Sequence, residues 1–474
     1  MPVDSVRPDV AEMLPRWDKI RAAIDGGSAV KKAGDRYLPR PNPTDMSVAN
    51  YKRFEQYLFR AVYYGVTGNT LSGLIGQAFA ADPMVSVPRA LDPMLADVNA
   101  AGLSLNQQAQ ATLAEVVSIG RVGLLADFPR LDRSTTMREI QQGIIKPRII
   151  TYRANDVINW ATSHDGLRSR LSLVVLRESY APAGGDEFGG LTDVQYRVLR
   201  LTDGIYTCTI YRKTPDGGVV VVPELSGTPL GSDGQPLTEI PFICCGATNN
   251  DPGIDSPPLE ALADLNLAHY RNSADYEEAV YLVGQPTPWI SGLTQQWVSE
   301  VLTGTDGQPR ILLGSRAPIP LPEGGAAGLL QVAANSMPLE AMREKQSQML
   351  ALGARLVDAS APTRTLGEAL LDNAVQSCVL SRCAGNVSAA YTQALRWCAG
   401  FVGADAGSIE YAISTDYQAS RVDAATRAQI VAGWQAGLTT WSEARAELRA
   451  GGVELDDDAD ARDVIDANPV GLAP

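Results

Sequence analysis

The residues that could do chemistry are few, and the most suggestive of them lie in one glycine-rich stretch. Residues 61–80 read AVYYGVTGNTLSGLIGQAFA. Four glycines lie within twelve residues there: Gly65, Gly68, Gly73 and Gly76. A GxxxxGK[ST] phosphate loop needs a lysine after its last glycine, but Leu74 follows Gly73, and no lysine or arginine lies between Arg60 and Arg89. We therefore expect the glycines to let neighbouring backbones approach closely.

The histidines and cysteines form no arrangement typical of catalysis or metal binding. His164 and His269 are the two histidines, and neither lies in an HExxH motif. Ser163 and His164 are adjacent and point apart on a strand or turn, so we interpret Ser163–Gly166 as a turn. An α/β enzyme with its site at 61–80 or at 163–166 stays the alternative. The spacing of the cysteines fits no zinc site, and we expect six free thiols: Cys208, Cys244, Cys245, Cys378, Cys383 and Cys398.

Composition argues against several functional classes. The 474 residues suggest two to four domains or one subunit of several parts. A net charge of −14 argues against tight binding of nucleic acid through its phosphates. The acidity is concentrated at the end of the chain, because residues 404–474 carry 13 acidic and 5 basic residues. No uninterrupted apolar run of 18 residues and no apolar signal-peptide core occurs, so we expect neither a membrane span nor secretion.

The first half of the chain predicts a polar arm, helices and a β-rich region. Residues 1–45 are polar and contain several prolines, which indicates an arm that packs on another element or frays. Helical spacing of apolar residues follows from about 48 to 80, and a helix at about 104–120 ends at Gly120. A short strand comes next, and residues 147–256 contain five further strand-like runs. Asp203–Gly204 between two of these runs predicts a hairpin.

The second half predicts three long helices. Asp255-Ser256-Pro257 favours a helix start, and about 26 helical residues reach Val283. Residues 284–335 are rich in proline and glycine, with two β-like pieces (TPWISGL and PRILLGSRAPIPL) and a short helix, QQWVSEVL, between them. A second helix over 336–357 carries a heptad-like stripe: Leu339, Met342, Gln346, Met349, Gly353 and Leu356. After the break DASAPTR, a capping box at Thr365–Glu368 predicts a helix of some 35 residues.

The last part of the chain predicts a strand and a helical end. SIEYAIS (408–414) is expected to pair with a distant strand, and residues 421–436 to form a helix. A second capping box at Thr440–Glu443 opens a short helix. These two helices leave a helix-turn-helix DNA-binding module as an alternative. The second helix carries Arg445 and Arg449 but also Glu443 and Glu447, so its net charge is nil and a structural helical hairpin is favoured.

Taken in order, these stretches resemble the portal (head-to-tail connector) proteins of tailed bacteriophages. The resemblance covers about residues 45–450 and includes no catalytic signature. The segments that carry it are GRVGLLADFP (120–129), PRIITYRANDVINW (147–160), QYRVLRL (195–201), PLEALADLNLAHYRNSADYEEAV (258–280), GQPTPWISGL (284–293) and MLALGARLV (349–357).

The resemblance implies an α+β fold, namely an elongated portal-type subunit. Its parts would be an N-terminal arm (1–45), a mixed α/β wing (46–256), a first stem helix (257–283), a small α/β clip (284–335), a second stem helix (336–357), a tunnel loop (358–364), a long wing helix (365–403), a wing strand (404–420), and a helical crown with an acidic tail (421–474).

The resemblance also implies the function and the partners. Such subunits form a ring, usually of twelve copies, at one capsid vertex, and double-stranded DNA passes through its channel during packaging and ejection. Expected partners are further copies of the chain, the major capsid protein, the large terminase subunit and later the head-tail adaptor. The expected location is the virion, with assembly in the host cytoplasm, without membrane, cofactor, metal or enzymatic activity.

Two sets of site residues follow from the resemblance. The DNA channel would be lined by residues of the tunnel loop and the second stem helix: Asp358, Ser360, Thr363, Arg364, Arg343 and Lys345. Terminase and adaptor would dock on residues of the clip: Trp289, Trp297, Arg310 and Arg316. Of the break residues, Arg364 is the cation that could contact a phosphate.

Overall fold

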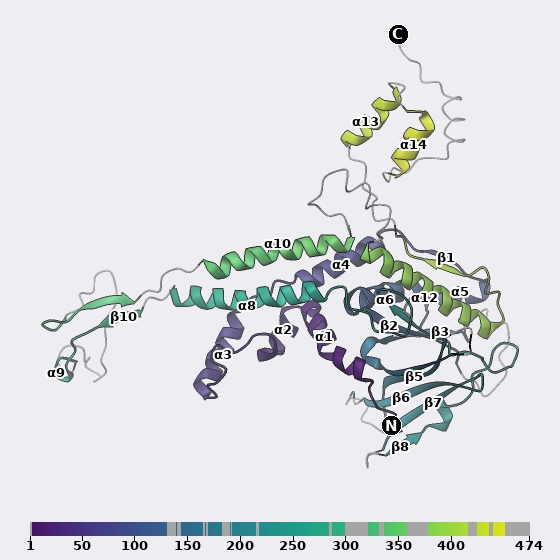
Figure 1. Cartoon of the computed structure of the whole chain (residues 1–474), viewed down its shortest axis with the longest axis horizontal. Coiled ribbons are helices and arrows are strands. Elements are labelled where there is room, and N and C mark those ends of the chain that lie inside the picture. The colour runs from purple at the N-terminus through teal and green to yellow at the C-terminus, as the bar shows by residue number, and fades with distance from the viewer. Residues whose placement is uncertain are drawn as a thin grey trace, which may run out of the picture. The chain divides into compact units, whose positions relative to one another are not determined.

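The computed structural model contains both helices and antiparallel sheets, so the expected α+β class is confirmed (Figure 1). The structure describes residues 2–129, 139, 144–164, 166, 169–182, 190, 192–214, 218–283, 287–298, 321–330, 336–357, 378–415, 424–435 and 439–450. The chain forms two compact units, each made of distant segments. The first consists of Met1–Leu14, Leu71–Pro258 and Arg355–Pro474, and the second of Pro15–Thr70 and Leu259–Ala354.

A five-stranded antiparallel sheet lies in the first unit, with the strand order β4-β5-β6-β7-β8. Its strands are β4 (Val157–His164), β5 (Ser169–Tyr180), β6 (Asp193–Thr202), β7 (Ile205–Lys213) and β8 (Val219–Val221). Asp203 and Gly204 join β6 to β7 with φ angles of 53° and 76°. Both angles are left-handed, as the predicted two-residue hairpin requires. The sequence analysis did not identify β4 as a separate strand.

A second sheet of the first unit packs against two helices. Its order is β3-β2-β9, with β2 (Arg121–Asp127) between β3 (Arg148–Arg153) and β9 (Phe242–Gly246). The helices are α6 (Leu105–Ile119) and α12 (Val379–Val402). Gly120 ends α6 in the left-handed conformation, as predicted, because a side chain is strained at its φ of 87°. The described part of the predicted 365–403 helix is α12.

Shorter elements complete the first unit. β12 (Glu410–Ala412) pairs with the distant β1 (Met84–Ser86), which confirms the predicted long-range pairing of SIEYAIS. The 3-10 helices η2 (Arg89–Leu91), η3 (Ala154–Asp156) and η4 (Pro223–Leu225) and the helix α5 (Asp92–Ala96) join the strands. At the C-terminal end, α13 (Ala424–Gln435) precedes α14 (Trp441–Ala450). The Thr440–Glu443 capping box is confirmed by reciprocal hydrogen bonds of 2.8 and 3.3 Å.

The second unit is mainly helical. Its long helices are α8 (Glu260–Val283) and α10 (Met337–Val357), and its N-terminal part contains α2 (Gly27–Lys32), η1 (Gly34–Arg36) and α3 (Val48–Arg60). α1 (Pro8–Asp25), α4 (Val66–Ala78) and α10 each begin in one unit and end in the other. One core cluster joins residues of α3, such as Phe54 and Tyr57, to Leu267, Tyr270 and Ala274 of α8.

The predicted polar arm at 1–45 is instead largely helical, and its apolar side chains are buried. Val10, Met13, Trp17 and Ile20 recur along α1 at spacings of 3, 4 and 3 and are fully or almost fully buried. Pro15 lies inside α1 without ending it. The sequence left open whether this arm packs on another element or frays, and the buried stripe shows that it packs.

The insert between α8 and α10 contains a two-stranded sheet. β10 (Thr287–Ile290) pairs antiparallel with β11 (Ala327–Leu330), and α9 is a single turn, Gln295–Trp297. The sequence had suggested a second β-like piece at 309–321, of which only Leu321 is described. The described partner of TPWI is therefore the segment at 327–330, which the sequence analysis did not identify.

The glycine-rich stretch and the cysteines gave two further expectations. Residues 66–78 form the helix α4, and a Cβ added at Gly68 would lie 2.7 Å from the carbonyl oxygen of Ile24. Close packing is therefore confirmed for Gly68, but Gly65, Gly73 and Gly76 have open space at the Cβ position. All six cysteines are free thiols, as predicted, and Cys378 is the one that is not fully buried.

Candidate functional site

The expected channel residues that the structure describes lie on α10. Arg343 is exposed, whereas Lys345 is half-buried and faces α8. With the amide of Asn272 oriented so that its oxygen faces Lys345, this oxygen accepts a hydrogen bond from Nζ at 3.1 Å. The other expected channel residues, Asp358, Ser360, Thr363 and Arg364, lie outside the described residues. Of the two described cations, Arg343 is thus the more accessible to a ligand.

The predicted stripe of α10 faces α8. Met342 and Met349 are buried, and Gln346 lies 3.3 Å from Nε2 of His269 on α8. Burial lowers the pKa of His269, and the nearby charge of Lys345 acts in the same direction. The imidazole is therefore neutral at pH 7, and it serves as a packing residue between two helices. Its Nδ1 has no partner in the described structure.

The side of α8 that faces away from α10 forms ion pairs with the N-terminal helices. Glu260 at its start receives hydrogen bonds from Arg16 at 2.8 Å and from Lys19 at 3.3 Å. Near its end, Glu278 pairs with Arg60. The pKa of Glu260 is lowered because Arg16 and Lys19 stabilise the carboxylate more than burial destabilises it. The acidic residues of this helix are therefore partly neutralised within the unit.

The expected docking residues lie in and beside the β10–β11 sheet. Trp289 on β10 is exposed over nearly half of its surface, and Trp297 in the α9 turn is half-buried. The ring of Trp289 lies over Gly328 of β11, where an added Cβ would lie 2.9 Å from its Nε1. Arg310 and Arg316 lie outside the described residues. A two-stranded sheet with an exposed tryptophan has little core of its own, which is typical of a surface that a partner covers.

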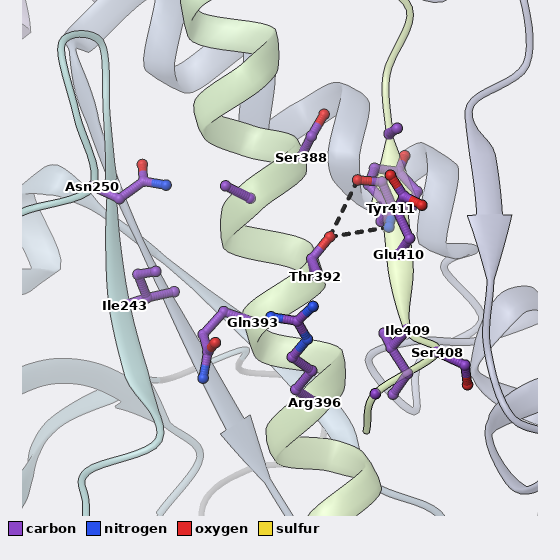
Figure 2. A pocket seen from close by; sticks show the side chains of 13 residues that line it. Ile243, Asn250, Ser388, Thr392, Gln393, Arg396, Ser408, Ile409, Glu410 and Tyr411 are labelled. Carbon is purple, nitrogen blue, oxygen red and sulfur yellow. Dashed lines mark hydrogen bonds between the residues drawn. The ribbon is translucent and has the colours of Figure 1, made fainter. Parts of the chain in front are cut away.

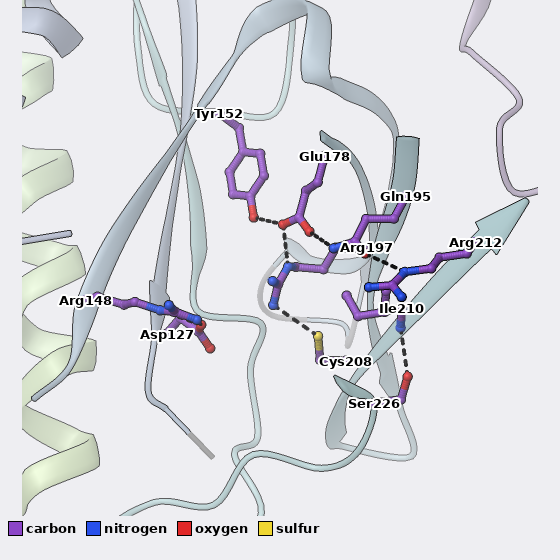
Figure 3. Close-up of polar contacts among 10 residues, drawn as sticks. All are labelled: Asp127, Arg148, Tyr152, Glu178, Gln195, Arg197, Cys208, Ile210, Arg212 and Ser226. Carbon is purple, nitrogen blue, oxygen red and sulfur yellow. Dashed lines mark hydrogen bonds and ion pairs between the residues drawn. The ribbon is translucent and has the colours of Figure 1, made fainter. Parts of the chain in front are cut away.

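A buried polar network lies in the first unit, between the two sheets (Figure 3). Glu178 on β5 accepts hydrogen bonds from Tyr152 at 2.5 Å, Arg197 at 2.6 Å and Gln195 at 2.9 Å. Burial raises the pKa of Glu178, but the charge and hydrogen bonds of Arg197 and its neighbours outweigh burial, and the net pKa is lowered. A carboxylate held by three donors is a poor general base. We interpret the network as the element that fixes β3, β5 and β6 in register.

A pocket of about 780 Å³ lies in the first unit, between α12, β9 and β12 (Figure 2). Thr392 of α12 accepts a hydrogen bond from the backbone N–H of Tyr411 at 3.0 Å, and Ser388 accepts one from Ile413 at 2.9 Å. These hydroxyls accept hydrogen bonds from backbone N–H groups on the edge of β12 that does not pair with β1. Arg396 and Gln393 of α12 also line the pocket. The lining holds no histidine or cysteine among the described residues, and nothing in it activates a nucleophile.

The alternative sites gain no geometric support. Gly65–Gly76 is largely helical, and Ser163 and His164 are consecutive residues at the end of β4. Within the described ranges, no three His, Cys, Asp or Glu side chains are grouped closely enough to hold a metal ion. Over the same part of the chain, no helix is both long and apolar enough to cross a lipid bilayer.

Comparison with known proteins adds one finding. Residues 258–402 match the model of a family described as a domain of unknown function, DUF4055. The matched segment begins just before α8, includes the insert and α10, and ends at the last residue of α12. No curated protein matches the chain.

Proposed function

We propose that this chain is the subunit of a bacteriophage portal. Copies of it form a closed ring at one vertex of a capsid, and double-stranded DNA passes through the channel of that ring during packaging and ejection. The insert between α8 and α10 is the surface to which the terminase docks first and the head-tail adaptor later.

The observation that carries the proposal is the arrangement of α8, the insert and α10. Two helices of 24 and 21 residues, about 36 and 32 Å long, pack side by side and bracket a small β-structured insert. The chain then continues into a further long helix, α12, that packs on a sheet. This is the order of stem, clip, stem and wing helix in the portal family that the sequence resembles.

Charge supports the same proposal. A channel for DNA must not hold phosphates tightly, and the chain has a net charge of −14. A helix-turn-helix protein would instead present a basic recognition helix, whereas α14 contains as many acidic as basic residues.

The test is the particle formed by the purified full-length chain. We expect negative-stain images to show rings with a central hole, and mass measurement in solution to give an integral number of copies near twelve. Monomers or dimers at every protein and salt concentration, together with absence from purified virions, would contradict the proposal. A dimer that shifts duplex DNA in a gel would support the helix-turn-helix alternative.

A second test uses the tunnel loop that the sequence predicts at 358–364. Arg364→Glu, or deletion of residues 359–363, should leave ring formation intact and reduce the packaging or retention of DNA. Arg200→Glu, an exposed change in the five-stranded sheet of the first unit, is the matched charge control. Full, infectious particles at the parental yield from the deletion variant would show that the loop has no such role.

A further inference from the structure

α3 carries apolar residues on two opposite faces. One face is buried against the second unit's core through Phe54 and Tyr57. The other face, which we call the α3 outer face, consists of Val48, Tyr51, Lys52, Glu55 and Phe59, all exposed. Val48 and Phe59 are 73% and 78% exposed, and Tyr51 is 52% exposed. A helix that is apolar on both sides is typical of a buried position, so something covers this second face.

Two neighbouring residues enlarge the exposed apolar surface at the ends of α3. Met46 precedes the helix and Val62 follows it, and both are more than half exposed. Several exposed apolar residues on one element mark an interaction site more often than isolated ones do. Lys31 of α2 lies at the margin, with its Nζ 6.0 Å from the centre of the Phe59 ring. The surface is therefore apolar with a basic margin.

The second unit has another exposed helix face, on α10. We call it the α10 outer face, and it consists of Met337, Glu340, Glu344, Ser347 and Ala351. Met337 is 72% exposed, and this face carries Glu340 and Glu344, with exposed Arg343 at its edge. Ser347 and Ala351 are small enough for another helix to approach closely. An acidic face with room for bulky side chains is complementary to an apolar face with a basic margin.

These two faces point in opposite directions, because α8 lies between α3 and α10 (Figure 1). α8 turns Leu267, Tyr270 and Ala274 toward α3 and places His269 and Asn272 against α10. At 100° per residue these two sets lie on nearly opposite sides of the helix. One copy therefore cannot bring its own α3 outer face onto its own α10 outer face.

We propose that the α3 outer face of one copy binds the α10 outer face of a second copy. The contact is head-to-tail, because each copy contributes a different face, and repetition of such a contact closes a ring when the rotation between copies allows it. Phe59, Tyr51 and Val48 pack on the small residues of α10, while Lys52 and Lys31 lie near Glu340 and Glu344. Glu55 is the one acidic residue of the α3 outer face. This inference rests on the proposed ring and names the surfaces that close it.

The first test compares the assembly of matched variants. Phe59→Asp should raise the protein concentration at which half of the chains are assembled at least about tenfold, because a charge enters an apolar contact. Leu230→Asp changes an apolar residue of the first unit that is 51% exposed, and it should leave assembly at the parental level. Far-UV circular dichroism and the unfolding midpoint of both monomers should match the parent, since neither side chain is buried.

The second test identifies directly which surface covers the α3 outer face. Parent rings are assembled from equal parts of ¹⁴N- and ¹⁵N-labelled chains and treated with a reagent that joins lysines to carboxylates. We expect mixed-isotope cross-links between Lys31 or Lys52 and Glu340 or Glu344. Cross-links of these lysines solely within one copy, or to other elements of a second copy, would overturn the inference.

The outcomes separate this inference from the proposed function. If the parent and Phe59→Asp form rings equally well, the inference is wrong and the portal proposal stands. If the parent forms no rings, the proposed function fails as well. If Phe59→Asp stays monomeric while Leu230→Asp assembles, and the mixed-isotope cross-links appear, the inference is supported.

Discussion

Asn266 of α8 accepts two hydrogen bonds from Thr67 of α4, although 199 residues separate them. Its Oδ1 atom lies 3.1 Å from the Thr67 nitrogen and 2.9 Å from the Thr67 hydroxyl. Tyr63 donates to the same oxygen at 2.9 Å, and Nδ2 of Asn266 donates to the carbonyl of Tyr64 at 2.7 Å. One fully buried side chain thus joins the first turn of α4 to the second turn of α8.

Replacing this side chain should therefore be costly. Asn266→Ala leaves buried donors without partners, and we expect the free energy of unfolding to fall by about 2–4 kcal/mol. Urea denaturation of the monomer measures this free energy of unfolding. Asn69→Ala, an exposed change on α4, should alter the same quantity by less than about 0.5 kcal/mol. Equal effects of the two substitutions would show that the hydrogen bonds contribute little.

The glycines of α4 should respond in opposite directions to substitution by alanine. Gly68→Ala places a Cβ against the Ile24 carbonyl, so we expect a loss of about 1–3 kcal/mol. Gly73→Ala adds a Cβ in open space within a helix and should raise stability by about 0.5–1 kcal/mol. Thermal unfolding of both monomeric variants tests the pair. Stabilisation by Gly68→Ala would contradict the close approach of α4 to α1.

The Glu178 network should contribute a pH-dependent part of the stability. The pKa of Glu178 is lower in the folded chain than its ordinary value of 4.5, so its stabilisation is complete above pH 4.5. It should be lost as the pH falls through the lowered folded pKa. Glu178→Gln leaves the Arg197 charge buried and uncompensated, which should cost about 3 kcal/mol at pH 7.

The measurement is the difference in unfolding free energy between parent and Glu178→Gln across pH. This difference should shrink as the pH falls below about 4.5, because the parent then also carries a protonated side chain at this position. Arg212→Gln, at the half-buried margin of the same network, serves as the control and should give a smaller, pH-independent difference. A constant difference for Glu178→Gln would show that the carboxylate charge is not involved.

Substitutions of Arg343 and Lys345 should have different effects, the first on the passage of DNA and the second on the stability of the chain. Arg343 is exposed, so Arg343→Glu should lower the packaged DNA per particle severalfold with little change in monomer stability, if the portal proposal is correct. Lys345→Gln should instead lower the free energy of unfolding by about 1 kcal/mol, because Nζ lies against Asn272 between two helices. DNA content of particles and urea denaturation are the two measurements. Unchanged packaging with Arg343→Glu would remove this residue from the channel.

The features that the sequence predicted correctly are mostly local. The Asp203–Gly204 turn, the Gly120 helix end and the Thr440–Glu443 capping box each depend on residues within one or two turns of chain. Residue preference at such positions has a direct steric or hydrogen-bonding cause, so a single sequence suffices.

The features that were missed depend on distant partners. β10 pairs with β11 some 40 residues later, and nothing in TPWI identifies AGLL as its complement. The network around Glu178 combines residues of β3, β5 and β6, whose registers follow from the whole sheet. The candidate site residues were taken from a family resemblance. The structure distinguishes the described ones by exposure, since Arg343 is exposed and Lys345 is half-buried.

The hydrogen bond from Tyr57 of α3 to Asp275 of α8 spans 218 residues, which has a consequence for synthesis. A ribosome that adds 5–20 residues per second needs roughly 10–40 s to make the chain between them. During this interval the emerged N-terminal helices expose Phe54 and Tyr57 as well as their outer face. Nascent chains should therefore be recognised by chaperones until α8 has left the exit tunnel.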